Sequence, residues 1–373
     1  MPRAASFAIF LGIFSVFLYV ANLVVYEALA ALFQLTAASQ LLTLGIVLGI
    51  LSASFIAANV LGMRYYNAAT RVYYTLSASW IGAFCYLFFA SVAYGILVGI
   101  APKFSNAEAT EYAGIALFAA AIMASAYGLL HAQRIKVKKV TITLPRLPLE
   151  WKNKQAIWIS DVHLGQVHGP RFARKVVSAV NAERPDIIFV GGDLYDGTGA
   201  PDPYDLAEPF IDMRAPWGVY FITGNHEEFG DSSRFLQAVR DVGMQVLMDE
   251  MVAVHGVAII GVDYKNASNA EHFKNTLSSF ALTEKMMPSI LLKHEPKDLQ
   301  VAADAGVSLN LSGHTHYGQQ WPFGLLAQLV YKGFAYGLKN HGRLQVLTSS
   351  GVGTWGPPLR VGSDSELVEI TFA

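Results

Sequence analysis

The sequence predicts a membrane region of about four helices, followed by a folded α/β domain. The first observation is a split in charge, because residues 1–131 carry only seven Asp, Glu, Lys and Arg side chains. The second is a change of pattern near residue 140, where long apolar stretches give way to short apolar runs that alternate with amphipathic segments. We therefore divide the chain into a transmembrane helical region at 1–131, a basic juxtamembrane linker at 132–150 and a folded domain at 151–373.

Four stretches of the membrane region are long enough to cross a bilayer core, which needs about 20 apolar residues. They lie at residues 7–26, at 41–62, within 72–100 and at 112–130. The uncharged residues 28–40 form either an interfacial helix or an outer loop. The first stretch is longer than the apolar part of a signal peptide and further spans follow it, so we expect it to remain as a membrane helix.

Lys and Arg in the short loops predict the orientation, because such loops stay in the cytoplasm when they are basic. Arg3 precedes the first stretch, Arg64 and Arg71 flank the second loop, and four basic residues between 134 and 139 follow the last stretch. The outer loops hold only Lys103, beside two glutamates. We therefore expect the folded domain on the cytoplasmic side. The basic run after the last stretch either attracts anionic lipid or is a plain stop-transfer flank.

Composition excludes some classes of protein. The formal net charge of −1 gives no sign of affinity for nucleic acid, which we do not expect as a partner. The single cysteine, Cys85, excludes an internal disulfide.

The folded domain shows short apolar runs typical of strands buried on both faces. We expect strands at residues 156–160, 186–190, 218–223, 289–293 and 307–311, and further strands at 257–262, 344–348 and 367–371. Amphipathic segments between them predict helices at 170–183, 205–213, 232–242 and 296–305. This alternation is typical of an α/β architecture.

Five short motifs follow the ends of the first five strands. They are Asp161-Val162-His163, Gly192-Asp193-Leu194-Tyr195-Asp196, Gly224-Asn225-His226-Glu227, His294 and Gly313-His314-Thr315-His316. Because ligands bind beyond the carboxyl ends of strands in open α/β sheets, we expect these motifs to converge. Their carboxylate, amide and imidazole groups suit two divalent cations, with Mn²⁺ expected first and Fe or Zn²⁺ as alternatives.

Two metal ions at one edge predict an enzyme that hydrolyses phosphate esters with a metal-bound hydroxide. Asp193 is the natural candidate for a carboxylate that bridges the two ions. We expect His226, next to Asn225, to protonate the leaving oxygen as a general acid. We also expect the carboxylate of Asp196 to keep that imidazole protonated and oriented.

The ordered set of motifs resembles that of the calcineurin-like metallophosphoesterases, whose pattern is D-x-H, G-D-x-x-D, G-N-H-[DE], H and G-H-x-H. The resemblance covers roughly residues 151–372. It implies a four-layer α/β/β/α sandwich and two sets of ligands. One metal takes Asp161, His163, Asp193 and His316, and the other takes Asp193, Asn225, His294 and His314. It also implies that His226 is the catalytic histidine and is paired with Asp196.

Two further segments, at residues 313–319 and 351–360, resemble the membrane-associated branch of bacterial phosphoesterases. That branch usually has glycine where this chain has Tyr317, so we expect a bulkier mouth to the site. Arg360 either binds a substrate phosphate or is a structural arginine. Some members cleave the pyrophosphate of UDP-2,3-diacylglucosamine in lipid A synthesis. The resemblance therefore implies a bacterial inner-membrane protein, with the bilayer as a partner and a lipid-linked or small phosphoester as substrate.

Other functions remain open from the sequence. A phosphoesterase of this kind acts on a soluble nucleotide or a phosphoprotein in some relatives, and the bond cleaved is a monoester, a diester or a pyrophosphate. A scaffold or sensor that keeps the fold without the chemistry is the second class, although it predicts gaps among the ligands and none is missing. A transporter predicts buried charges in the four spans, which hold almost none.

Overall fold

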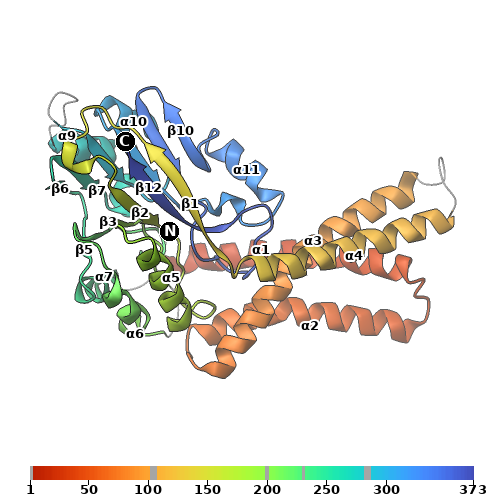
Figure 1. Cartoon of the computed structure of the whole chain (residues 1–373). Coiled ribbons are helices and arrows are strands. Elements are labelled where there is room, and N and C mark those ends of the chain that lie inside the picture. The colour runs from red at the N-terminus through yellow and green to blue at the C-terminus, as the bar shows by residue number, and fades with distance from the viewer. Residues whose placement is uncertain (1–2, 101–106, 198–200, 229–231, 281–286) are drawn as a thin grey trace. The chain divides into compact units, whose positions relative to one another are not determined.

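The computed structural model describes residues 3–100, 107–197, 201–228, 232–280 and 287–373 (Figure 1). Lys103, which the orientation argument uses, lies outside the described residues. The chain divides into two compact units. The first comprises Met1–Gly62 and Asn67–Leu129, and the second comprises Met63–Tyr66 and Leu130–Ala373.

The first unit is built from long apolar helices. They are α1 (Arg3–Leu32), α2 (Ala38–Gly62), α3 (Ala68–Ile100) and α4 (Ala107–His131). Each predicted stretch falls within one helix, and within the described residues each of the four helices is long and apolar enough to cross a membrane. Helix α1 continues through residue 32, so only residues 33–37 connect it to α2. The sequence thus fits a membrane protein, as predicted.

Helices α1, α2 and α3 pack around a small apolar cluster that includes Val25, Leu48 and Phe84. The side chain of Asn22 lies in this region and donates hydrogen bonds to the hydroxyl of Ser52, at 3.0 Å, and to the carbonyl of Leu18, at 2.8 Å. A polar side chain in a membrane helix needs such partners, because lipid offers none. Asn22 therefore joins α1 to α2.

The second unit contains two six-stranded mixed sheets. The first sheet has the order β1 (Ile135–Ile142), β12 (Ser365–Phe372), β2 (Gln155–Ile159), β3 (Ile187–Val190), β4 (Val219–Phe221) and β5 (Gln245–Val246). The second has the order β10 (Gly337–His341), β11 (Leu344–Thr348), β9 (Leu309–Ser312), β8 (Ser289–Leu292), β7 (Val257–Gly261) and β6 (Glu250–Val254). Strands β2, β3, β4 and β5 run parallel, as do β7, β8, β9 and β11.

The two sheets share one core and each is covered by helices on its other face. Alternate strand residues such as Trp158, Phe189 and Ile290 belong to the core between the sheets. Ile157 and Ile188 face the other way, into a cluster with helix residues from α5 (Pro170–Ala182) and α7 (Ser232–Asp241). Because successive side chains of a strand point to opposite sides of the sheet, both faces of the sheet are buried. This arrangement confirms the predicted α/β/β/α sandwich.

The remaining helices are short. They are η2 (Leu149–Trp151), α6 (Pro203–Ala207), η3 (Glu208–Asp212), α8 (Tyr264–Ala267), α9 (Ala270–Ser279), α10 (Leu299–Asp304), η4 (His316–Gly318) and α11 (Phe323–Val330). The helix predicted at 205–213 is split into α6 and η3. The helix predicted at 296–305 begins only at Leu299, because Asp298 before it has a left-handed backbone with φ 55°.

Strand β1 lies where the sequence predicts a linker, at residues 132–150. It pairs in parallel with β12, from Ile135 opposite Ser365 to Ile142 opposite Phe372 (Figure 1). Acidic side chains meet its lysines: Lys136 Nζ lies 2.9 Å from an oxygen of Asp364, and Lys139 Nζ lies 2.6 Å from an oxygen of Glu369. Most of this range is therefore part of the folded unit. Strands β6 and β10 were likewise not predicted.

Candidate metal centre

The five motifs follow the carboxyl ends of five parallel strands in the two sheets. Strands β2, β3 and β4 lead to Asp161, Asp193 and Asn225, and strands β8 and β9 lead to His294 and His314. Because β2, β3 and β4 are neighbours in one sheet and β8 and β9 in the other, their loops meet at one edge of the sandwich. The structure brings all seven predicted ligands together there.

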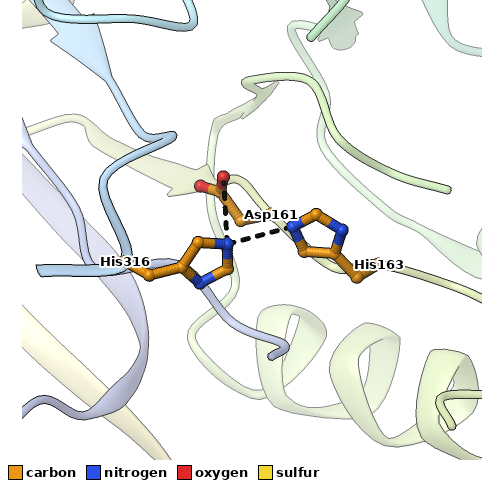
Figure 2. A group of neighbouring side chains, drawn as sticks. All are labelled: Asp161, His163 and His316. Carbon is orange, nitrogen blue, oxygen red and sulfur yellow. Dashed lines mark hydrogen bonds and ion pairs between the residues drawn. The ribbon is translucent and has the colours of Figure 1, made fainter. Parts of the chain in front are cut away.

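Asp161, His163 and His316 form the first group of candidate ligands, and Figure 2 shows their side chains turned toward one another. Nε2 of His163 lies 3.0 Å from Nε2 of His316, which in turn lies 3.7 Å from Oδ1 of Asp161. All three residues are buried. Two ring nitrogens and a carboxylate converging in this way make a donor set that suits a divalent transition metal.

Asp193, His294 and His314 form the second group. Nε2 of His294 lies 3.2 Å from Oδ2 of Asp193 and 3.2 Å from Nδ1 of His314. Nδ1 of His294 is 2.7 Å from the carbonyl oxygen of Gly191. An N–H bond to that carbonyl fixes the tautomer and leaves the lone pair of Nε2 for a metal.

Asp193 lies between the two groups. Its Oδ2 atom is 3.2 Å from Nε2 of His294 in the second group and 3.8 Å from Nε2 of His163 in the first. The carboxylate is buried, and the charges of the surrounding histidines hold the pKa of Asp193 well below its usual range against the opposing effect of burial. One ionised carboxylate is therefore within reach of both groups, as a bridging ligand must be.

Asn225 supplies a further donor. Its Oδ1 atom is buried and has no hydrogen-bond partner among the described residues. Asn225 lines a cavity of about 400 Å³ together with His163, Asp193 and His226. A buried amide oxygen without a partner is unfavourable, by about 1–3 kcal/mol. A cation at this edge would satisfy it, so the residues present fit a pair of divalent metal ions.

Several candidate ligands have backbones in the left-handed region. The φ angles are 55° at Asp161, 52° at His163, 51° at Asp193, 69° at His314 and 46° at His316. A residue other than glycine costs free energy in this conformation and keeps it only where its surroundings impose it. Such strain concentrates at functional sites, which agrees with the convergence of these side chains.

Glu227 imposes part of this geometry, a role that the sequence motif did not reveal. Its buried carboxylate accepts hydrogen bonds from the backbone N–H groups of Gly224, at 2.7 Å, Asp193, at 2.9 Å, and Leu194, at 2.8 Å. Burial and the charge of Asp193 raise the pKa of Glu227 to about 7, while these hydrogen bonds oppose the rise. Glu227 thus joins the second and third motifs.

The role predicted for Asp196 is different in the structure. Nδ1 of His226 is 2.8 Å from the backbone carbonyl oxygen of Asp196, not from its carboxylate. The carboxylate oxygen Oδ1 instead lies 3.2 Å from Nδ1 of His163, an ion-pair distance at which the two atoms do not meet hydrogen-bond geometry. Burial lowers the pKa of His226, whereas the charge of Asp193 and the carbonyl and charge of Asp196 oppose this shift.

Arg360 does not reach the cavity, which corrects the expectation of a phosphate contact. The side chain is fully buried, and its guanidinium donates to the carbonyl oxygens of Gly353, Ser350 and His316 and to the hydroxyl of Ser363. These bonds occupy its donors. Arg360 is therefore a structural arginine that holds the loop before β12 against the His316 turn.

Tyr317 does not narrow the mouth as expected. Its ring stacks on Tyr336, with 4.8 Å between ring centroids. Phe323 and Trp355 are the aromatic side chains that line the cavity. Neither was singled out from the sequence, because no motif marks them.

Comparison with known proteins agrees with this geometry. The family model for calcineurin-like phosphoesterases matches residues 156–318. A transmembrane protein with a metallophosphoesterase domain from Danio rerio is 30% identical over 326 residues, which cover 80% of this chain and 73% of that protein. An uncharacterized metallophosphoesterase from Aquifex aeolicus is 32% identical over 258 residues, which cover 68% of this chain and 97% of that protein.

The chain belongs to the calcineurin-like phosphoesterases. The matched range of this family, residues 156–318, contains the seven candidate ligands and His226, but not Arg360. An uncharacterized metallophosphoesterase from Helicobacter pylori is 32% identical, and the match spans 63% of that relative. Membership identifies the second unit as a phosphoesterase domain, with clustered His and Asp residues suited to a dinuclear metal site.

Proposed function

We propose that this protein is a membrane-anchored, di-metal phosphohydrolase. The observation that carries the proposal is the position of Asp193 between two groups of buried ligands at one cavity. Two divalent cations bound there, Mn²⁺ or else Fe or Zn²⁺, would activate water and neutralise phosphoryl oxygens. A scaffold that had lost its chemistry would not need to keep both groups complete.

The ligands divide between two metal positions. One position would take Asp161, His163 and His316, the other would take Asn225, His294 and His314, and Asp193 would contribute to both. The contacts that orient the histidines support this division. The carboxylate of Asp196 faces Nδ1 of His163, and the carbonyl of Gly191 faces Nδ1 of His294, so that Nε2 of each ring points toward the ligands. Such outer contacts keep metal-binding histidines in one orientation.

His226 is the proposed general acid. The bond between its Nδ1 and the Asp196 carbonyl fixes the ring, which lines the cavity beside the ligands. With Nδ1–H held in this way, Nε2 is the atom that would exchange a proton with the leaving oxygen. Burial lowers the pKa of His226, so the imidazole must take up a proton before it can protonate the leaving oxygen.

The membrane helices favour a substrate held in or near the bilayer. We propose a phosphoester or pyrophosphate of a lipid-linked compound such as UDP-2,3-diacylglucosamine, cleaved at the cytoplasmic face of a bacterial plasma membrane. The proposal rests on the resemblance of residues 313–319 and 351–360 to the membrane-associated branch, and on the four apolar helices. A soluble nucleotide or a phosphoprotein is the alternative substrate.

A hydrolysis panel tests this function. The purified full chain would be loaded with Mn²⁺ and given a nucleotide-sugar lipid, a phospholipid, a soluble nucleotide and a phosphopeptide, with products identified by mass spectrometry. Preferred cleavage of the lipid-linked compounds supports the proposal, whereas preference for the nucleotide or the phosphopeptide supports the alternative. Binding of two metals without hydrolysis of any phosphoester would favour a scaffold. Protease accessibility in intact cells tests the orientation.

A further inference from the structure

Helix α11 (Phe323–Val330) is apolar except for Gln328, and most of its residues are exposed. Leu325 is 67% exposed and Leu329 is 76% exposed, and Leu326 and Val330 are also exposed. In the part of the chain that the structure describes, α5, α7 and α9 each bury one face, whereas no residue of α11 is buried. A helix that is apolar all round needs a partner to cover it.

This helix is fixed to the candidate metal centre. It follows η4, which begins with His316, and the N–H of Phe323 donates to the carbonyl of Gln320 at 2.8 Å. Gly318 lies so close to the start of α11 that an added Cβ would clash with the backbone nitrogen of Gly324. Phe323 also lines the cavity, so the apolar surface of α11 begins at the cavity wall.

Trp355 extends the apolar surface on another wall of the cavity. Its ring lies 6.1 Å from that of His226, and more than half of its side chain is exposed. Gln319 holds this loop, because its side chain donates to the carbonyls of Trp355 and Pro357 and accepts from the N–H of Trp355. A second exposed tryptophan, Trp321, lies two residues before α11 begins. Tryptophan prefers the boundary between water and lipid.

The exposed charges within the segment that contains this surface have one sign. From Gln319 to Ser363 the sequence contains no Asp or Glu, while Lys332, Lys339 and Arg343 are exposed cations. Exposed cations beside apolar and tryptophan side chains are typical of surfaces that insert into a membrane containing anionic lipid.

The connection to the first unit favours a bilayer as the occupant. Only residues 132–134 separate the end of α4 from the start of β1. Three residues extend over about 10 Å at most, so the phosphoesterase domain stays close to any membrane that α4 crosses. If α4 crosses a bilayer, that bilayer therefore stays within reach of this domain.

We propose that α11, together with Trp321 and Trp355, is a membrane-docking surface that inserts into the headgroup region of the bilayer. We call it the α11 surface. It would place the cavity mouth at headgroup depth, so that an amphiphilic phosphoester reaches the candidate ligands while its apolar part stays in lipid. The substrate class rests on the proposed function, whereas the membrane contact does not.

A depth measurement tests the contact without using activity. The full chain would carry Cys85→Ala, to remove its only cysteine, and a fluorescent label at Leu329→Cys in lipid nanodiscs with a quencher on the acyl chains. Ile211→Cys on η3 is the matched control, because Ile211 is 65% exposed. We expect quenching at position 329 and little at 211. Equal quenching at both positions, or cross-linking of position 329 between two copies, would overturn the proposal.

A kinetic comparison tests the substrate class. The double variant Leu325→Glu with Leu329→Glu would be compared with Ile211→Glu on an alkyl p-nitrophenyl phosphodiester in phosphatidylcholine vesicles and on soluble bis(p-nitrophenyl) phosphate. We expect the ratio of vesicle to soluble kcat/KM to fall by about tenfold or more in the double variant only. An unchanged ratio would reject an amphiphilic phosphoester as the substrate. Failure of the unmodified chain on both esters would reject phosphodiesterase activity. The hydrolysis panel would then judge the proposed function, and the depth measurement would judge the membrane contact.

Discussion

The carboxylate of Asp196 lies 3.2 Å from Nδ1 of His163, and the backbone carbonyl oxygen of Asp196 lies 2.8 Å from Nδ1 of His226. One residue therefore orients two histidines with different roles, a candidate metal ligand through its side chain and the proposed general acid through its main chain. A side-chain substitution at Asp196 therefore removes the carboxylate beside His163 but keeps the carbonyl that holds the His226 ring.

Replacing Asp196 with asparagine should weaken metal binding while leaving His226 in place. The carbonyl that accepts from His226 remains, but the negative charge beside His163 is lost, and changes behind a ligand typically cost about 10–100-fold in affinity or activity. Titration with Mn²⁺ measures the affinity, with exposed Asp205→Asn as control. Unchanged affinity together with a shifted pH–rate profile would show that the carboxylate acts on His226 after all.

Replacing Asp193 with asparagine should abolish turnover and weaken the binding of both metals, because this carboxylate lies between the two groups. Elemental analysis of the purified variant would report the number of metals bound per chain. A variant that retained two metals and full activity would disprove the bridging role.

Replacing His226 with alanine should leave metal content intact and lower kcat by about 10²–10⁴-fold. The loss should be greatest for esters with poor leaving groups, since these need protonation of the departing oxygen. Rates on a series of aryl and alkyl esters measure this dependence. An equal loss on every ester would argue against proton donation.

Replacing Glu227 with glutamine should destabilise the phosphoesterase domain. The amide NH₂ would face backbone N–H groups that now donate to a carboxylate, and an unmatched buried donor costs about 1–3 kcal/mol. Thermal unfolding of the metal-free full chain in detergent isolates this effect from metal loss, with neighbouring Glu228→Gln as control. Equal Tm values for the two variants would contradict the role of Glu227 in joining the two motifs.

Much of the fold could be predicted from local pattern. The apolar runs ending at Ile159, Val190 and Leu292 show their strands because both faces are buried, and the motifs after them mark the common edge. Strand β1 could not be predicted in this way, because its three lysines look like a basic flank. Only its pairing with β12, more than 200 residues later in the chain, gives Lys136 and Lys139 their acidic partners.

Local sequence pattern also predicted only part of the site. Residue type and order were enough to predict which seven donors converge, but their binding of metal remains a prediction. Which side chain orients which histidine depends on angles set by the folded loops, and the motif pattern carries no information on them. No element was predicted at residues 323–330, although the segment is apolar. The exposure of its side chains is a property of the described structure.

Arg360 offers a test of one such tertiary contact. Its guanidinium is buried among carbonyl oxygens and lies beside the ring of His316, with Nη2 3.2 Å from Nδ1 of that ring. Lysine keeps the charge but has three donors in place of the planar set of five, so Arg360→Lys leaves several carbonyls unpaired. We expect a loss of stability of about 2–4 kcal/mol and weaker Mn²⁺ binding through His316, with KM for a soluble phosphodiester unchanged in metal-saturated protein.

Exposed Arg343→Lys is the matched control. A normal Tm together with a raised KM would instead show that Arg360 contacts the substrate phosphate, which requires the loop at 351–360 to open during turnover.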